Sequence, residues 1–357
     1  MKKTICLLLA LILTLSVFAG CANTGTNTDP TDAPVTEKPS DNEQDNDPVV
    51  KETAKIAFIS NEAIDSEEWI QNLVAGLSAW EEQHEGYEIQ VIEATEVDEY
   101  YPKTLAACEA GYDIIITSYS DMAEATIRCA EEYPDVMFGT LDGEIENIAD
   151  YKNIQDFRLN RNQTAFVQGY VAALMTKTGK VGFIGGGEYA SIDELLAGWQ
   201  YGIQYANPDV EDLVCYTNTF TDPTAGKEYA MSLIAEGCDV VYACAGGSGT
   251  GAAQACQESG VMFAACDVHY PEAAPDVELG STLYYFDVMM LAFIEDAISG
   301  NYAPGTSKEY GIAEGAGNYA FAETNTLVTD EIKEKVVEIE AKIANGEIEL
   351  SKTPLHK

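Results

Sequence analysis

The sequence of 357 residues predicts an α/β protein with two doubly wound lobes. Short β-branched and aromatic runs alternate with segments in which apolar residues recur every three or four positions, and two such series follow each other along the chain. Strands that alternate with helices form parallel sheets with helices on both faces. The length is also too great for one ordinary core, and it fits two domains of about 150 residues each.

The first series begins with the run KIAFIS at 55–60, which we expect to be a strand. A helix should follow, with Asp65 as its N-cap and Glu68 three residues later. The apolar residues from Trp69 to Trp80 repeat on one face of that helix. The other strands expected in this series are 87–94, 112–117 and 136–141, and the other helices are 98–110 and 121–133.

The second series repeats this scheme from residue 162 to residue 266. Its expected helices are 162–178, 192–206, 222–236 and 251–259, and its expected strands are 180–185, 213–216, 239–243 and 261–266. Ligands of open α/β sheets bind beyond the carboxyl ends of the strands, so the residues that follow the strands of both series should line a cleft. These residues are polar, aromatic or glycine-rich: Ser60-Asn61, Thr117-Ser118, Asp142-Gly143, Gly185-Gly186-Gly187, Phe220, Ala245-Gly246-Gly247 and Asp267.

The N-terminus has the layout of a secretory signal peptide at 1–20, with two lysines ahead of an apolar run. The segment Phe18-Ala19-Gly20-Cys21 is typical of a lipobox, so we expect Cys21 to be lipidated. Cleavage by the ordinary signal peptidase, which would leave a free N-terminal cysteine, is the alternative. Residues 21–52 are acidic and polar, so we expect a disordered linker behind the lipidated cysteine.

The charge and the cysteines exclude several classes of protein. With 60 acidic and 19 basic residues the formal net charge is −41, which argues against binding nucleic acid or lying on an anionic membrane. Beyond Cys21 seven cysteines remain, with no CxxC pair and no zinc-type spacing. We expect them to be small buried apolar residues and expect no bound metal.

The enzyme motifs that a two-lobed α/β protein could carry are missing. The run GGSGTG at 246–251 follows a strand but does not fit G-x-G-x-x-G, and no Walker A motif occurs. The chain has three histidines, and no spacing suggests a nucleophile with its base. We therefore expect no cofactor and no catalytic residues, and we interpret Gly247 as part of a tight turn that lets the backbone approach a small ligand.

Three further segments carry a family resemblance: TKTGKVGFIGG at 176–186, YTNTFTDPTAGKE at 216–228 and AGGSGTG at 245–251. With them, residues 55–345 resemble the basic membrane protein family of bacterial lipoproteins, which are substrate-binding proteins of ABC importers for purine nucleosides. The resemblance implies a type I periplasmic-binding-protein fold with three crossover strands. It implies one lobe from 53–159 with 282–310 and a second from 160–281 with 311–350.

The resemblance also implies ligand-binding residues. In the family two aromatic rings sandwich the purine, and the matching residues are Trp69 and Phe220. Asp142 matches an acidic ligand contact, and Asp267 matches a residue that binds ribose hydroxyls. Asn61 stands where the family has a strand-end Asp, while Ile70 and Tyr284 replace its base-reading Asn and a ribose-binding Lys. Structural roles are the alternative: Trp69 would head the apolar face of its helix, and each aspartate would cap a loop.

Together these observations predict a lipid-anchored, extracytoplasmic substrate-binding protein on the cell membrane. Closure of the lobes would trap a nucleoside-like molecule, and an ABC permease with its ATPase would accept it. Three alternatives stay open: a binder of sugars or other small solutes on the same fold, a sensor that reports to a signalling partner, and a surface enzyme that acts on nucleosides.

Overall fold

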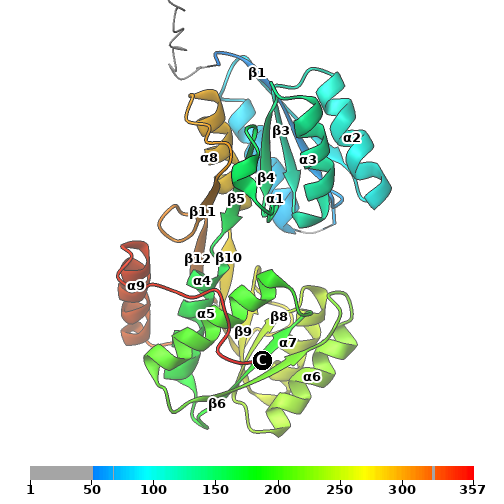
Figure 1. The fold of residues 1–357 in the computed structure, drawn as a ribbon. Helices are drawn as coiled ribbons and strands as arrows, with labels where there is room; N and C mark the ends of the chain where they lie inside the picture. Colours follow the sequence, from blue (N-terminus) through cyan, green and yellow to red (C-terminus); the bar gives the residue numbers. More distant parts are fainter. Residues whose placement is uncertain (1–50, 67, 324–325) are drawn as a thin grey trace, which may run out of the picture. The chain divides into compact units, whose positions relative to one another are not determined.

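The computed structural model describes residues 51–66, 68–323 and 326–357. The predicted signal peptide, Cys21 and nearly all of the predicted linker lie outside the described residues. The described part of the chain forms two six-stranded sheets, and both belong to one compact unit of the chain (Figure 1).

The first sheet has the order β11-β5-β4-β3-β1-β2, and every neighbouring pair is parallel. Its strands are β1 (Ala54–Ser60), β2 (Tyr87–Glu93), β3 (Ile114–Ser118), β4 (Met137–Leu141), β5 (Ile154–Leu159) and β11 (Ser307–Tyr310). The helices associated with it are α1 (Glu68–Glu81), α2 (Val97–Glu109), α3 (Ala123–Glu132) and α8 (Phe286–Ile298), with the short 3-10 turns η1 (Ser120–Met122) and η2 (Ile148–Asp150).

The second sheet has the order β12-β10-β9-β8-β6-β7, and only β12 runs antiparallel to its neighbour. Its strands are β6 (Lys180–Gly185), β7 (Glu211–Tyr216), β8 (Val240–Cys244), β9 (Met262–Cys266), β10 (Glu278–Tyr284) and β12 (Gly317–Phe321). The helices associated with it are α4 (Arg161–Met175), α5 (Ala190–Ala206), α6 (Pro223–Ala235), α7 (Gly247–Ser259) and α9 (Asp330–Ala344).

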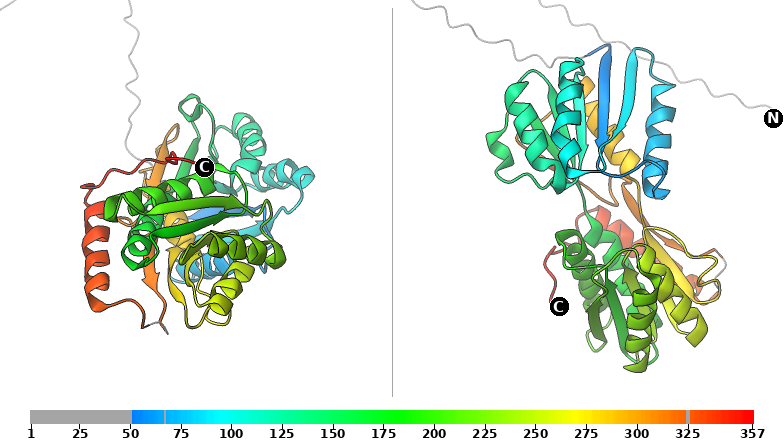
Figure 2. Two further views of the ribbon diagram at one scale, coloured as in Figure 1. Left: turned by 90° about the horizontal axis from the view of Figure 1, so that it is seen from below. Right: turned by 90° about the vertical axis from the view of Figure 1, so that its right-hand side faces the viewer.

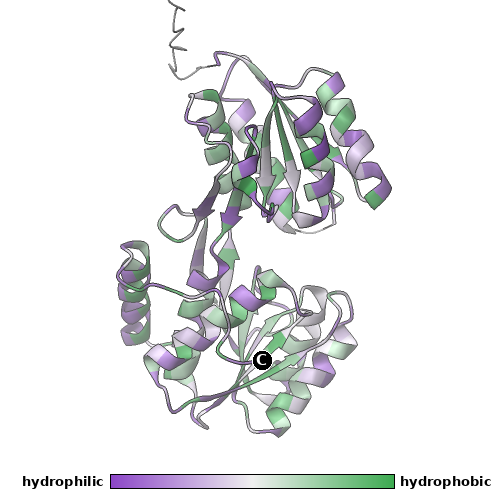
Figure 3. Ribbon diagram, in the orientation of Figure 1, coloured by the Kyte–Doolittle hydropathy of each residue, from purple (hydrophilic) through white to green (hydrophobic). Residues whose placement is uncertain are grey.

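Each sheet is buried on both faces, as the alternation of strands and helices predicted. Successive side chains of a strand point to opposite faces. Ile56 and Phe58 of β1 therefore join the core formed with α1 and α8, while Ala57 and Ile59 join the core formed with α2 and α3. Figure 2 shows helices on both sides of the first sheet, and Figure 3 shows how apolar its strands are. The predicted fold class is confirmed.

The chain passes between the two sheets three times. It crosses from β5 into α4, from β10 into α8, and from β11 into β12. In the first two crossings a strand of one sheet runs directly into a helix on the core of the other. These crossings set the ends of β5 and β10 beside the functional site described below.

Several predicted boundaries were wrong by a few residues, and the contacts around two of the helix starts are informative. Helix α1 begins at Glu68, so Asp65 is not its N-cap; instead the Ser66 backbone N–H and hydroxyl donate to the Ala63 carbonyl and close a turn. Helix α7 begins at Gly247 rather than at 251, although glycine disfavours helices. Packing against α6 explains this, because a Cβ on Gly251 would lie 1.7 Å from the Pro223 carbonyl oxygen. Glycine is what allows the two helices to approach this closely.

We predict that Gly251→Ala destabilises the protein. Helix propensity alone would favour alanine by about 1 kcal/mol. The backbone clash with Pro223 should reverse the sign and cost roughly 1–3 kcal/mol of unfolding free energy, measured by urea denaturation. Gln254→Ala, an exposed change on the same helix, is the matched control and should be nearly neutral. A G251A variant as stable as the parent would show that the two helices can separate freely.

Candidate functional site

A cavity of about 780 Å³ lies where strands of both sheets end. Its lining includes residues that follow β1, β3, β4 and β5 of the first sheet, and others that follow or end β8, β9 and β10 of the second. All of these strands, β10 included, reach the cavity at their carboxyl ends, and each has a parallel neighbour there. The carboxyl ends of parallel strands are where open α/β sheets bind ligands. The cavity is large enough for a drug-sized or nucleoside-sized molecule.

Three strand ends that line this cavity have strained backbones. Tyr119, Asp142 and Asp267 directly follow β3, β4 and β9, and their φ angles are 58°, 51° and 66°. Residues other than glycine rarely adopt this region, and such strain clusters at binding sites. Each of the three donates its backbone N–H to the neighbouring strand, at 2.7, 2.9 and 2.9 Å. One extra bond of the sheet ladder therefore holds each residue at the cavity edge.

Five of the six predicted binding residues line the cavity. They are Asn61, Trp69, Asp142, Phe220 and Asp267. Gly247 is not among the lining residues. Its neighbour Gly246 is, with φ at +51°, and it precedes the first residue of α7. The close backbone approach that the glycine-rich run suggested thus falls one residue earlier than expected.

The first aromatic group comes from the first lobe. The Trp69 ring contacts Phe286 and Tyr119, with centroids 5.0 and 5.9 Å apart, and all three rings line the cavity. Trp69 also packs against the core of the first sheet, so its position on the apolar face of α1 is compatible with a ring that lines the cavity. Burial raises the pKa of Tyr119 well above its ordinary value, so this ring stays a neutral phenol.

The second aromatic group comes from the second lobe. Phe220 is 38% exposed, and its ring contacts that of Tyr189 with centroids 5.8 Å apart. Glycine makes room for it, because a Cβ on Gly186 would lie 2.2 Å from the Phe220 ring. An apolar ring held exposed over a glycine at a cavity wall is well placed to stack on a ligand.

Asn61 is held by the neighbouring strand. Its backbone N–H donates to the Ser118 hydroxyl at 2.9 Å, and that hydroxyl lies 2.8 Å from Asn61 Oδ1, to which it can donate. These two contacts at the ends of β1 and β3 orient the amide at the cavity wall. The side chain is thereby presented in a fixed orientation to anything that enters.

Asp142 is not an isolated carboxylate. Its Oδ2 lies 2.6 Å from Arg161 Nη2, and its Oδ1 accepts the Leu159 backbone N–H at 3.0 Å. Burial acts to lower the pKa of Arg161. The charge and the hydrogen bond of Asp142, with smaller contributions from Tyr119 and Tyr284, together outweigh burial, so the pKa of Arg161 is raised. A ligand at this wall meets an ion pair. Sequence reasoning missed Arg161, although Arg158 and Arg161 are two of the chain's three arginines; Arg158 lies near the end of β5, and Arg161 follows that strand.

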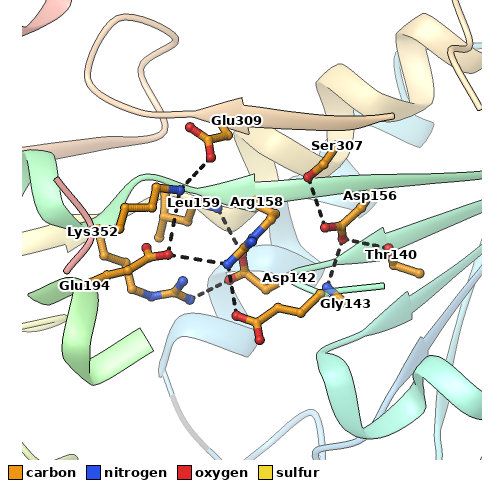
Figure 4. Close-up of polar contacts among 12 residues, drawn as sticks. Thr140, Asp142, Gly143, Asp156, Arg158, Leu159, Glu194, Ser307, Glu309 and Lys352 are labelled. Atoms are coloured by element: carbon orange, nitrogen blue, oxygen red, sulfur yellow. Dashed lines mark hydrogen bonds and ion pairs between the residues drawn. The ribbon is translucent and has the colours of Figure 1, made fainter. Parts of the chain in front are cut away.

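A second set of ion pairs surrounds the first (Figure 4). Arg158 Nη2 lies 2.9 Å from a Glu144 oxygen and 3.4 Å from Glu194 Oε1, and Lys352 Nζ lies 2.6 Å from Glu309 and 3.7 Å from Glu194. Glu194 belongs to α5, whereas Arg158 and Glu309 belong to strands of the first sheet. Burial raises the pKa of Glu194 despite these cations. Arg158 of β5 and Lys352 of the C-terminal segment thus both lie near the buried Glu194 carboxylate of α5, and Lys352 also connects it to Glu309 of β11.

Tyr284 occupies the position where the family resemblance implied a lysine. It lines the cavity, and its hydroxyl lies 3.0 Å from Thr164 Oγ1. Burial raises the pKa of Tyr284 well above its ordinary value. This position therefore offers a neutral hydroxyl where a lysine would place a positive charge.

The seven described cysteines are all unpaired, and six of them are buried. Cys244 and Cys266 end β8 and β9 and contribute to the cavity lining. Burial raises the pKa of the Cys244 thiol well above its ordinary value, so it stays protonated. No group of three or more His, Cys, Asp or Glu side chains in the described part of the chain is arranged to hold a metal ion.

The loop that begins with Asp267 is held by a histidine. His269 Nδ1 lies 2.5 Å from Glu278 Oε1, and the Tyr270 N–H donates to Glu278 Oε2 at 2.8 Å. The bond to Glu278 raises the pKa of His269 above 6.5. This contact joins the loop after β9 to the start of β10.

We predict that Asp142 and Arg161 are energetically coupled, so that removing Arg161 alone destabilises the protein more than changing both residues. Arg161→Met should cost about 3 kcal/mol of unfolding free energy, because it leaves the Asp142 carboxylate buried without its partner. Adding Asp142→Asn should recover part of that loss. Urea denaturation of the two single variants and the double variant measures the coupling. Arg128→Met, at an exposed position, is the control, and equal losses from both arginine changes would contradict the prediction.

We predict a pH-dependent contribution from His269. Its folded-state pKa is raised, so its contribution to stability is complete below pH 6.5 and is lost as the pH rises through the folded-state pKa. His269→Gln should therefore flatten this part of the curve of melting temperature against pH. The same curve for His84→Gln is the control. If both variants follow the parent curve, the Glu278 contact contributes no net stability.

Within the ranges that the structure describes, no helix combines the length and the apolar character needed to cross a bilayer.

Several known proteins are similar to this chain in sequence or in fold. The chain is 26% identical over 304 residues to basic membrane protein A of Borreliella burgdorferi, covering 83% of this chain and 87% of that one. It is 29% identical over 206 residues to the ABC transporter nucleoside-binding protein BmpA of Lactococcus lactis, covering 57% of this chain and 58% of that one. A solute-binding protein of an ABC transporter system from Conexibacter woesei matches its fold with a TM-score of 0.69 at 19% identity, over 84% of this chain and 99% of that one.

Residues 53–353 match the family profile Bmp, described as ABC transporter substrate-binding protein PnrA-like. This match spans both sheets and the whole cavity, and it confirms the resemblance drawn from the three sequence segments. The chain therefore belongs to the Bmp family of PnrA-like ABC transporter substrate-binding proteins.

Proposed function

We propose that this protein binds a nucleoside-like solute in the 780 Å³ cavity and delivers it to an ABC permease. The observation that carries the proposal is the pairing of two aromatic groups, one from each lobe, in a single cavity with polar strand ends. Trp69 and Phe220 are the rings we assign to stacking. Stacking on an aromatic side chain contributes roughly 1–3 kcal/mol for each base.

The polar groups of the cavity suit hydroxyl-bearing ligands. Asp267 follows β9 at the cavity edge, and a carboxylate can accept hydrogen bonds from two neighbouring hydroxyls. The Asn61 amide offers a donor and an acceptor, and Gly246 leaves the backbone accessible. The relative from Lactococcus lactis is named as nucleoside-binding, which supports the same ligand class.

The remaining parts of the proposal concern where the protein is anchored and how it opens and closes during transport. We infer that Cys21 is lipidated and that the linker ties the body to the extracytoplasmic face of the cell membrane. The three crossings between the sheets would act as the hinge. A ligand that contacts both lobes stabilises the closed form relative to the open form, and the permease with its ATPase would recognise that closed form.

We predict that Phe220→Ala weakens nucleoside binding by roughly 5- to 150-fold, because loss of one stacking ring removes roughly 1–3 kcal/mol. Trp69→Ala should weaken it similarly. The first measurement is a thermal-shift screen of purine and pyrimidine nucleosides with pyranose sugars alongside, followed by titration calorimetry with the best ligand.

Tyr205→Ala is the control, because this ring is 50% exposed on α5 and does not line the cavity. It should leave the affinity unchanged. Unchanged affinity in both F220A and W69A would remove the stacking role. A screen in which sugars stabilise the protein and nucleosides do not would replace the proposed ligand with a sugar.

A further inference from the structure

The cavity has a strong surplus of negative charge. The described residues that line it include six carboxylate side chains and one cationic side chain, Arg161. At neutral pH a carboxylate ordinarily carries a negative charge. Arg161 is held by Asp142 at 2.6 Å, so it has little charge left to offer a ligand. The six carboxylates are Glu62, Asp121, Asp142, Glu144, Glu188 and Asp267.

Cations just outside the lining do not remove this surplus. Arg158 pairs with Glu144 of the lining but also lies 3.4 Å from Glu194. Lys357 lies 3.8 Å from Glu188, but it is closer to Asp193, at 2.8 Å. Each of these cations is thus shared with a second carboxylate behind the cavity wall. Counting these two cations together with Glu194 and Asp193 leaves the excess of negative charge unchanged.

The uncharged part of the wall also favours a cation. Aromatic faces attract positive charge, and the attraction is stronger where water is excluded. Trp69, Phe286 and Tyr119 form one such cluster, and Phe220 with Tyr189 forms another. Tyr284 adds a half-buried neutral hydroxyl. A phosphate or carboxylate on the ligand would meet these carboxylates with no unpaired cation among the described lining residues.

We propose that the cavity selects for positive charge on its nucleoside-like ligand: it binds a cationic form more tightly than the matched neutral form and excludes the phosphorylated form. This inference rests on the proposed function, whose ligand class it narrows. The carboxylates attract a cation electrostatically as it enters the cavity from water, and the faces of the aromatic rings can make cation–π contacts with it. A neutral nucleoside would gain only the stacking and the hydrogen bonds.

The test uses ligand pairs that differ in charge and little else. Adenosine is compared with 5′-amino-5′-deoxyadenosine, which replaces a hydroxyl with an ammonium group. The isomers N6-methyladenosine and 1-methyladenosine are compared because the second is a cation at neutral pH. Adenosine 5′-phosphate is the anionic member. Calorimetry at low and high salt should show the cation of at least one pair binding about tenfold tighter, with a smaller difference at high salt, and no binding of the phosphate.

Two variants locate the effect. Asp121→Asn and Glu188→Gln each remove one lining carboxylate at an exposed position, and together they should reduce the preference for the cation while neutral adenosine still binds. Glu228→Gln removes the same charge from an exposed position on α6 outside the lining and should leave the preference unchanged.

The outcomes separate the two proposals. Neutral and cationic partners that bind equally in both pairs, or phosphate that binds as well as adenosine, would overturn the charge selection and leave nucleoside binding intact. A preference that E228Q lowers as much as the lining variants do would overturn the role of the cavity carboxylates. If no member of the panel binds, and no purine or pyrimidine nucleoside of the thermal-shift screen binds either, both the charge selection and the proposed nucleoside function fail.

Discussion

The ion pair between Asp142 and Arg161 is the contact on which the site depends. Arg161 is the first residue of α4, where its positive charge opposes the positive end of the helix dipole, and neither an acidic first turn nor a side-chain cap offsets it there. Asp142 supplies that counter-charge from the strained position after β4. The pair therefore ties the end of a strand in one lobe to the helix that begins the other. It also forms part of the cavity wall.

Around this pair, parallel strand topology decides what the cavity contains. Because the strands point their carboxyl ends at the cavity, the residue after each strand is presented to a ligand, and three of those residues are held in left-handed backbone conformations by sheet hydrogen bonds. The strained backbone of these residues costs stability locally, and the additional hydrogen bonds to the neighbouring strands offset that cost. Aromatic rings from both lobes and carboxylates from several loops then share one space without any of them being close in sequence.

The physical character of that space differs from that of the protein surface as a whole. The chain is acidic overall, which by itself speaks only to solubility and long-range fields. Inside the cavity the carboxylates stand beside neutral tyrosines and partly exposed rings, and the nearby cations are already engaged. Charge selection is consequently a property of the site and not merely of the composition.

The sequence by itself determined the fold class, because strand and helix periodicities are local and buried strands carry continuous apolar runs such as KIAFIS. It also indicated five of the cavity residues. Asn61, Asp142, Phe220 and Asp267 lie beyond strands whose carboxyl ends meet at one edge of a sheet, whereas Trp69 was assigned by the family resemblance. Tertiary structure alone decided that Gly251 lies inside a helix, because the reason is the distance to Pro223 on another helix. It alone decided that Asp142 meets Arg161 and that Tyr189, Tyr119 and Phe286 share the cavity, because these contacts join segments whose spacing along the chain carries no periodic signal.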